Sequence, residues 1–301
     1  MSEDLNSAKC VVYGLAIGDA LGRDTEFMSF RQIKSSYGQD GITDLPEPAL
    51  FTDDTQMSVA IAEALVRDGE KDLKAIMEAV REEFVKWYHS PENNRSPGRT
   101  CLTGVANMEQ GTHWSKSGVA GSKGCGSAMR SAPIGYLYQR DPEKLKQVAH
   151  ATGICTHGHP AADAACIGAA YLVKLALDSL PFENMIPKLL SFTKGISGEW
   201  DDAILKIEQC LAWEDEEKAF AYLGEGWVGE EAVALVYLLG FQFQKRPLDQ
   251  TRSPSPQHPL HQPHPRMAPG LRPAHRLCPE AGLGGDRCAG GHGPGSDPGG
   301  T

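Results

Sequence analysis

The sequence has eight cysteines, but no two of them form a CxxC pair. Cysteines paired at that spacing are a usual sign of a zinc site, and a short cysteine-dense chain is a usual sign of a disulfide framework. Neither pattern is present in these 301 residues. Six of the cysteines lie before residue 246, among apolar or glycine-rich neighbours. We therefore predict reduced thiols in a cytoplasmic protein.

Long apolar runs are also lacking. The chain begins with the polar segment MSEDLNSAK, and no stretch reaches the roughly 18 uninterrupted apolar residues of a membrane span. We therefore expect neither a secretory signal nor a membrane partner. The formal net charge of -10 makes duplex DNA an unfavourable partner, because its phosphates would be repelled. A phosphate-bearing ligand can still bind locally through backbone amides.

Residues 246–301 contain no aromatic residue and no lysine. This segment holds 11 of the 20 prolines, 10 of the 33 glycines and 5 of the 10 histidines. A chain of this composition cannot bury enough apolar surface to offset the entropy lost on folding. We therefore predict a folded domain over residues 1–245 and a disordered tail over residues 246–301. The change is abrupt, which suggests a frameshifted or alternatively spliced C-terminus.

Helical periodicity runs through the folded part, whereas strand signals are weak and strands do not alternate with helices. Along Asp72–Tyr88, apolar residues such as Ile76, Val80 and Phe84 recur on one helical face. The Ala- and Gly-rich segment Ala8–Leu21 is expected to be a buried helix packed closely on its neighbours. Further helices are predicted over Ser58–Val66, Pro160–Leu177, Met185–Phe192, Ala203–Leu211 and Glu230–Gln244. The predicted fold class is therefore all-α, a compact domain of many helices.

Two adjacent aspartates stand in the segment Phe51–Gln56, which reads FTDDTQ. One interpretation is a helix cap, with Asp53 as the N-cap residue and Gln56 completing a capping box. This accounts for one aspartate and for the glutamine, but not for the second carboxylate or the flanking threonines. The other interpretation is a metal site, because carboxylate and hydroxyl oxygens are hard ligands that suit Mg²⁺ or Mn²⁺.

Three further segments are candidates, although none is specific by itself. GLAIGDALG, at Gly14–Gly22, either packs helices closely with Asp19 as a cap or a paired carboxylate, or leads to Glu26 in a loop near a cleft. GCGSAMR, at Gly124–Arg130, is either a simple turn or a loop whose backbone N–H groups bind phosphate oxygens. In THGHP, His157 is either bonded to a backbone carbonyl or in contact with a ligand.

In this order and at this spacing, the segments resemble the ADP-ribosylglycohydrolase family. The resemblance rests on GLAIGDALG with Glu26, FTDDTQM, GCGSAMR and THGHP, together with SPGRTC at Ser96–Cys101 and LGEGWVGEEA at Leu223–Ala232. It covers about residues 8–244. It implies an all-helical domain that hydrolyses the N- or O-glycosidic bond between ADP-ribose and an acceptor. The implied partner is an ADP-ribosylated protein or a small ADP-ribosyl conjugate.

The resemblance also implies roles for individual residues. It implies a pair of Mg²⁺ or Mn²⁺ ions, with Thr52, Asp53 and Asp54 as the first group of metal ligands. It implies that Glu26, Asp53 and Asp54 are catalytic, with Glu26 near the scissile bond. The substrate-binding residues that it implies are Gly124, Cys125, Gly126, Ser127, Ala128, Met129, Arg130 and His157. Carboxylates stabilise the oxocarbenium-like charge that builds up when an anomeric bond breaks, and metal ions orient the ribose hydroxyls.

One segment departs from the family pattern. The family has a second metal-ligand group near its C-terminus, a GGDxDT-like segment that opens a further helix. Here Gly284–Asp286 is followed by Arg287, Cys288 and Ala289, so the second aspartate and the threonine are missing. We therefore expect a weakened metal site and little or no activity from this chain. The alternative is a non-catalytic member of the same fold, an ADP-ribose-binding or crystallin-like structural protein.

Overall fold

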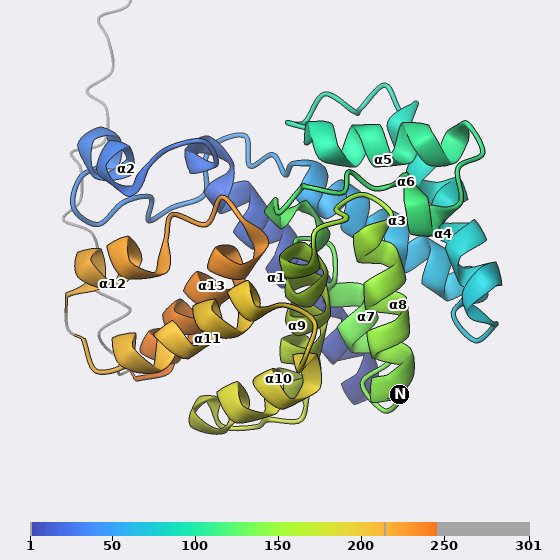
Figure 1. Cartoon of the computed structure of the whole chain (residues 1–301). Coiled ribbons are helices and arrows are strands. Elements are labelled where there is room, and N and C mark those ends of the chain that lie inside the picture. The colour runs from blue at the N-terminus through green and yellow to red at the C-terminus, as the bar shows by residue number, and fades with distance from the viewer. Residues whose placement is uncertain (1, 214, 246–301) are drawn as a thin grey trace, which may run out of the picture. The chain divides into compact units, whose positions relative to one another are not determined.

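The structure, a computed structural model, describes residues 2–213 and 215–245. Within these residues it consists of helices joined by loops and contains no strand, so the prediction of an all-α fold is confirmed (Figure 1). The α-helices are α1 (Ser2–Gly22), α2 (Phe30–Tyr37), α3 (Asp53–Asp68), α4 (Leu73–Tyr88), α5 (Arg99–Glu109), α6 (Trp114–Ser117), α7 (Ala132–Leu137), α8 (Pro142–Ile154), α9 (Pro160–Leu177), α10 (Met185–Thr193), α11 (Gly198–Cys210), α12 (Glu216–Leu223) and α13 (Gly229–Lys245). Short 3-10 helices are η1 (Arg23–Thr25), η2 (Cys125–Ser127) and η3 (Phe182–Asn184). The tail predicted over residues 246–301 lies outside the described residues.

The helices predicted from the sequence are present, and three of them begin five or six residues earlier than the apolar pattern indicates. α1 begins at Ser2 rather than at Ala8. α3 begins at Asp53 rather than at Ser58, because Thr52 caps it. α11 begins at Gly198, where Ser197 is the cap. The first turns of α3 and α11 are polar, so apolar periodicity alone does not reveal them.

Two clusters of buried apolar side chains form the core. In α4, Ile76, Val80 and Phe84 are fully buried, as their shared helical face predicts. They pack with α3 and α8 in the first cluster. The second cluster gathers around Trp200 of α11 and Tyr237 of α13. α9 contributes side chains to both clusters and so joins the two halves of the core.

The central helix α9 is long and apolar enough to cross a membrane by length and composition alone. Among residues 2–213 and 215–245 it is the one helix that passes this test, and 56% of that stretch is buried inside the protein. Asp163 and Lys174 interrupt its apolar sequence. It packs against α7, α8, α10, α11 and α13, which is the environment of a core helix.

Gly168 of α9 gives a test of this packing. A Cβ atom at Gly168 would lie 2.4 Å from the Trp200 indole. We expect Gly168→Ala to destabilise the protein by about 1–3 kcal/mol, as overpacking usually does. Gly14→Ala in α1 is the matched control, because its Cβ would meet nothing within 4 Å and alanine favours a helix by roughly 1 kcal/mol. Urea unfolding is the measurement, and equal midpoints for the two variants would contradict the packing.

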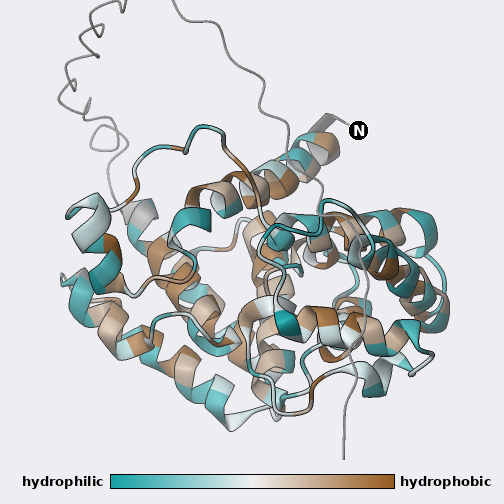
Figure 2. Ribbon diagram, turned by 90° about the horizontal axis from the view of Figure 1, so that it is seen from above, coloured by the Kyte–Doolittle hydropathy of each residue, from teal (hydrophilic) through white to brown (hydrophobic). Residues whose placement is uncertain are grey.

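The helix α1 is present, but the prediction that it is buried is wrong. Among its side chains that the structure describes, Ala20 alone is buried, while Val12, Tyr13 and Ile17 are 43%, 61% and 53% exposed. The glycines of α1 do not mark close packing either, since added Cβ atoms would contact nothing. Figure 2 shows hydrophobic residues, in brown, along this helix next to the N label. α1 therefore packs on α3 and α7 along one side. No described residue covers its other side.

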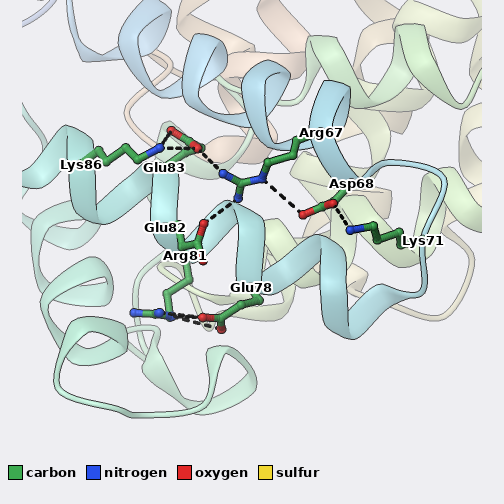
Figure 3. Close-up of polar contacts among 8 residues, drawn as sticks. All are labelled: Arg67, Asp68, Lys71, Glu78, Arg81, Glu82, Glu83 and Lys86. Atoms are coloured by element: carbon green, nitrogen blue, oxygen red, sulfur yellow. Dashed lines mark hydrogen bonds and ion pairs between the residues drawn. The ribbon is translucent and has the colours of Figure 1, made fainter.

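Ion pairs connect the outer surfaces of α3 and α4 (Figure 3). Arg67, near the end of α3, contacts Glu82 and Glu83 of α4 at 2.8 and 2.9 Å. Lys86 reaches the same Glu83 carboxylate at 2.8 Å. Glu83 is buried, but its partners Arg67 and Lys86 are 40% and 66% exposed, and pairs with such exposed partners contribute about 1 kcal/mol each. The apolar cluster beneath them therefore does most to fix α3, whose opposite end carries the candidate site.

Candidate active site

The two adjacent aspartates stand at the N-terminus of α3. Thr52 is the N-cap residue, and its hydroxyl accepts a hydrogen bond from the backbone N–H of Asp54 at 3.3 Å. The interpretation of Asp53 as the N-cap, with a capping box to Gln56, is therefore wrong. The Gln56 side chain instead donates to the carbonyl of Glu92 at 2.9 Å. Because the cap lies one residue earlier, neither aspartate side chain is needed to cap the helix.

Asp19, near the end of α1, holds this N-terminus in place. Its carboxylate accepts hydrogen bonds from the backbone N–H groups of Thr52 and Thr55 at 2.9 and 3.1 Å. It also accepts from their hydroxyls, at 2.7 Å for Thr52 and 2.5 Å for Thr55. Charge-assisted bonds and the helix dipole both stabilise a carboxylate at this position. Asp19 thus caps the helix from another element rather than pairing with a cation, and it accounts for the two threonines that flank the aspartates.

A cavity of about 790 Å³ opens beside these residues. Asp19, Glu26, Thr52 and Asp54 line one part of it, and apolar residues of α1, α7, α9 and α13 line the rest. Glu26 follows η1 in the loop after α1, where the sequence places it. The cavity therefore combines a carboxylate-rich part with an apolar wall.

Asp53 faces the segment that contains SPGRTC rather than the cavity. It is 3% exposed, and its carboxylate accepts a hydrogen bond from the backbone N–H of Gly98 at 3.2 Å. Its own backbone N–H donates to the carbonyl of Arg95 at 3.0 Å. This segment therefore also supports the start of α3.

Burial and mutual repulsion raise the pKa values of the carboxyl groups. Desolvation raises the pKa of Glu26 to about 7, and the charges of Asp53 and Asp19 add to the effect. Desolvation is also the main cause that raises the pKa of Asp54 to about 7 and that of Asp53 to about 6. Carboxyl groups with a pKa near 7 can accept and release protons at neutral pH. Perturbed carboxyl groups gathered at a cavity are a feature of active sites.

The glycine-rich loop borders the same region. Cys125, Ala128 and Met129 line a second, mostly apolar cavity of about 500 Å³ that also reaches Asp54. Burial raises the pKa of the Cys125 thiol to about 11, so this thiol stays protonated at neutral pH. Of the residues that the resemblance assigns to substrate binding, these three are the ones whose side chains reach the cavity.

His157 lies beneath this loop rather than in either cavity. It is 2% exposed, and its Nδ1 atom is 2.8 Å from the hydroxyl of Thr156. Cβ atoms at Gly124 and Gly126 would lie 3.3 and 2.8 Å from its imidazole, so glycine permits this close approach. Burial, with the charge of Arg130 as a second cause, lowers the pKa of His157 to about 3. The imidazole is therefore a neutral support of the loop.

Two other residues of the loop also point inward. Arg130 is fully buried, and its guanidinium donates to the carbonyl of Gly126 at 2.8 Å and to the hydroxyl of Thr156 at 2.6 Å. Ser127 is fully buried and donates to the carbonyl of Ala162 at 3.0 Å. The resemblance implies that both contact the substrate. The structure instead places their side chains inside the domain, where they fix the shape of the loop.

The oxygen atoms at the start of α3 suit a hard cation. Thr52, Asp53 and Asp54 offer hydroxyl and carboxylate oxygens, and a cation would relieve the repulsion that raises the carboxyl pKa values. Among the residues that the structure describes, however, no three His, Cys, Asp or Glu side chains are grouped so that they could hold a metal ion. Mg²⁺ commonly binds through one or two carboxylates and keeps several waters. Thr52 and Asp54, which line the cavity, therefore offer ligands for one such ion bound partly through water. The Asp53 carboxylate accepts a hydrogen bond from Gly98 through Oδ2, so only its second oxygen is left for a cation.

A helical domain with clustered carboxyl groups beside a glycine-rich loop has the parts of a glycosidase-type enzyme. A comparison with known protein families identifies which class of enzyme this is. The family model described as ADP-ribosylglycohydrolase matches residues 1–251, so the chain belongs to the ADP-ribosylglycohydrolase family. The resemblance seen in the sequence is thereby confirmed.

Three relatives illustrate the similarity. The chain is 32% identical to an uncharacterized protein of Archaeoglobus fulgidus, over 60% of this chain and 58% of the relative. It is 36% identical to the ADP-ribosyl-[dinitrogen reductase] glycohydrolase of Rhodospirillum rubrum, over 51% of this chain and 52% of the relative. It is 27% identical to the ADP-ribosylarginine hydrolase Tri1 of Serratia proteamaculans, over 55% of this chain and 46% of the relative. The chain thus spans about half the length of these curated relatives.

A solved structure supports the fold. It is described as an ADP-ribosylglycohydrolase-related protein complex and superposes with a TM-score of 0.51 at 21% identity. The match covers 79% of this chain and 88% of the other. At this identity the likeness concerns the fold alone.

Proposed function

We propose that this chain hydrolyses the glycosidic bond between ADP-ribose and an acceptor group, with a divalent cation bound at the start of α3. The observation that carries this proposal is that Glu26 and Asp54, from separate elements, line one cavity and both have pKa values near 7. Family membership supports the reaction type. The names of two relatives specify ADP-ribosyl groups on dinitrogen reductase and on arginine. An ADP-ribosylated protein is therefore the proposed substrate class.

Glu26 is the proposed acid–base residue. Because its pKa is about 7, it is partly protonated at neutral pH and can donate a proton to the leaving group or take one from water. Asp54 lines the same cavity, where its negative charge would stabilise oxocarbenium-like character at the anomeric carbon. Asp19 acts indirectly, because it holds Thr52 and the start of α3 in position.

Thr52 and Asp54 would hold the cation from the side of the cavity, and Asp53 would do so through the carboxylate oxygen that does not accept from Gly98. When bound, a divalent cation polarises oxygen atoms and orients the ribose hydroxyls. The N–H groups of Ala128 and Met129 donate to the Cys125 carbonyl, so the earlier N–H groups of the Gly124–Arg130 loop are the ones suited to hold the diphosphate. They need no net positive charge on the protein. The apolar wall of the cavity would keep water away from the reacting groups.

The cation site gives a direct prediction. Asp53→Ala and Asp54→Ala should each weaken Mg²⁺ binding by at least about tenfold, because each removes an anionic oxygen ligand. Calorimetric titration with Mg²⁺ is the measurement. Asp68→Ala, at the far end of α3, is the matched control and should leave the affinity unchanged. Unchanged affinity in both Asp53→Ala and Asp54→Ala would rule out a cation site at this position.

The pH dependence should have opposite signs for binding and for stability. Mg²⁺ affinity should rise between about pH 6 and pH 8, because Asp53 and Asp54 lose their protons over this range. In the cation-free protein, a carboxyl group whose pKa is raised on folding stabilises the fold below its unfolded pKa of about 4. That contribution is lost as the pH rises through about 6 to 7. Thermal unfolding at pH 5 and pH 8, in the wild type and in Asp54→Asn, checks this: the substitution should reduce the loss of stability at pH 8.

We further propose that turnover by this chain is low, since its sequence offers one ligand group instead of two. The test compares the chain with a variant whose residues 246–301 are replaced by a helix that begins with GGDxDT. Both are assayed for Mg²⁺-dependent release of ADP-ribose from arginine-linked and serine-linked conjugates. Faster release by the variant is expected, and equal release would contradict low turnover. Tight ADP-ribose binding without release by either protein would favour the alternative of a non-catalytic ADP-ribose-binding protein.

A further inference from the structure

One short segment contacts Asp53 twice. The backbone N–H of Asp53 donates to the carbonyl of Arg95 at 3.0 Å, and its carboxylate accepts from the backbone N–H of Gly98 at 3.2 Å. We call residues Arg95–Gly98 the clip. One contact holds the main chain of Asp53, and the other holds its side chain. The clip therefore fixes the direction in which the carboxylate points as well as its place at the start of α3.

The backbone of the clip takes an unusual turn at Ser96. Its φ angle of 54° lies in the left-handed region, which residues other than glycine rarely adopt. Such conformations persist where the surrounding structure holds them, and they cluster at functional sites. Ser96 stands between the two residues that contact Asp53. The turn at this position thus brings a carbonyl and an N–H group of the same segment to one aspartate.

The Arg95 side chain ties the clip to the residue that precedes the proposed ligand group. Its guanidinium donates to the carbonyl of Phe51 at 3.1 Å and lies over the Phe51 ring, 4.6 Å from the ring centroid. It also pairs with Glu92 at 3.1 Å. The carbonyl of Glu92 in turn accepts from the Gln56 side chain at 2.9 Å. The segment around the clip therefore contacts the chain both before and after Thr52–Asp54.

The bond from Gly98 has a consequence for cation binding. It engages Oδ2 of Asp53, so a cation on this carboxylate would be bound through Oδ1 alone. Mg²⁺ suits a ligand of this kind, because it demands near-ideal octahedral geometry, binds one or two carboxylates and keeps several waters. Ca²⁺ takes about six to eight oxygen ligands and often binds both oxygens of one carboxylate. A fixed one-oxygen ligand therefore favours Mg²⁺.

We infer that the clip positions Asp53 as a one-oxygen ligand and that this positioning makes the site prefer Mg²⁺ over Ca²⁺. The inference rests on the proposed function in one respect, namely that Asp53 binds a cation. Arg95 and Gly98 do not line the cavity of about 790 Å³, so they act through Asp53 and not on the substrate. They are positioning residues. Loss of a partner that orients a metal ligand typically lowers metal affinity by about 10–100-fold.

Gly98→Pro tests the clip by removing the N–H group that holds the carboxylate. The φ and ψ angles of Gly98, -64° and 130°, suit proline. An added Cβ would meet only the Cys101 sulfur, at 3.9 Å. Gly98 is the N-cap residue of α5, so its N–H takes no part in the hydrogen bonds of that helix. Gly98→Ala keeps the N–H group and is the matched control.

Binding of Mg²⁺ and of Ca²⁺ to the full chain is measured separately by calorimetric titration, and urea unfolding shows that each variant is folded. We expect Gly98→Pro to weaken Mg²⁺ binding by at least about tenfold and Ca²⁺ binding by less, because the released carboxylate can offer both oxygens to the larger ion. The ratio of the two affinities is the decisive quantity, since a loss of stability alone would leave it unchanged. Gly98→Ala should keep the wild-type ratio.

Arg95 provides a second test in which the backbone of the clip stays intact, and it decides the question if Gly98→Pro does not fold. Arg95→Ala should lower the Mg²⁺ affinity severalfold and lower the ratio to Ca²⁺ as well. Arg95→Lys should restore part of both, because lysine still offers a donor to the Phe51 carbonyl. Glu92→Gln is the control, since it removes only the exposed ion pair with Arg95.

A wild-type ratio in Gly98→Pro and in Arg95→Ala would overturn the clip, and so would equal losses in Gly98→Pro and Gly98→Ala. Failure of the proposed function looks different. Cation binding that depends on the clip, without release of ADP-ribose by the GGDxDT variant, would refute the proposed reaction and support the clip. Cation binding that Asp53→Ala weakens and Gly98→Pro leaves unchanged refutes the clip alone. No cation binding by the wild type refutes both.

Discussion

Glu26→Gln should lower the kcat of Mg²⁺-dependent ADP-ribose release by about 10²–10⁴-fold while ADP-ribose still binds. The amide has nearly the shape of the carboxyl group but cannot give or take a proton. Because the unmodified chain is expected to turn over slowly, the substitution is best measured in the variant with the GGDxDT helix. Calorimetry with ADP-ribose and steady-state kinetics on the same preparation separate binding from chemistry.

The pH profile makes this test more specific. Glu26 has a pKa of about 7, so the wild-type rate should change near neutral pH and the Glu26→Gln profile should lose that change. Asp24→Asn is the control, because this acid lies in the same segment but does not line the cavity. A Glu26→Gln rate within a few fold of the wild type would remove Glu26 from the chemistry. The acid–base role would then have to pass to another group.

The sequence predicts helices well where an apolar face decides them. α4 is the clear case, since Ile76, Val80 and Phe84 recur at helical spacing and are all buried. It predicts burial poorly where packing partners decide it. The Ala- and Gly-rich pattern of α1 is compatible with close packing, but whether a neighbour covers that helix depends on the rest of the fold. The periodicity of one segment carries no information on that.

In the candidate site, too, the sequence predicts what local residue types decide and misses what three-dimensional packing decides. Glu26 and the Thr52–Asp54 group could be picked out because their residue types stand out locally. The sequence indicates a capping role for Asp19 but not its partners, because Thr52 and Thr55 lie at the start of another helix. Arg130 is the opposite case. A charged residue in a glycine-rich loop suggests ligand contact, yet three-dimensional packing buries its guanidinium against carbonyl and hydroxyl oxygens.

Asp19→Ala should damage both stability and cation binding, although Asp19 belongs to neither the core nor the ligand group. The substitution leaves the N–H and hydroxyl donors of Thr52 and Thr55 without their acceptor. We expect a loss of about 2–4 kcal/mol in the free energy of unfolding, moderated by water that can reach this half-buried position. Because Thr52 and the start of α3 would lose their anchor, Mg²⁺ affinity should fall as well.

Asp19→Asn separates positioning from charge. Its amide oxygen can still accept two of the bonds, but its NH₂ group would face donors and the negative charge at the helix N-terminus is lost. Asn should therefore restore part of the stability and part of the Mg²⁺ affinity, and the two quantities should recover together. Asp24→Ala is the control for removing an acid from the same region. If Asp19→Ala lowered Mg²⁺ affinity at unchanged stability, Asp19 would have to be a ligand of the cation itself, and the proposed indirect role would be wrong.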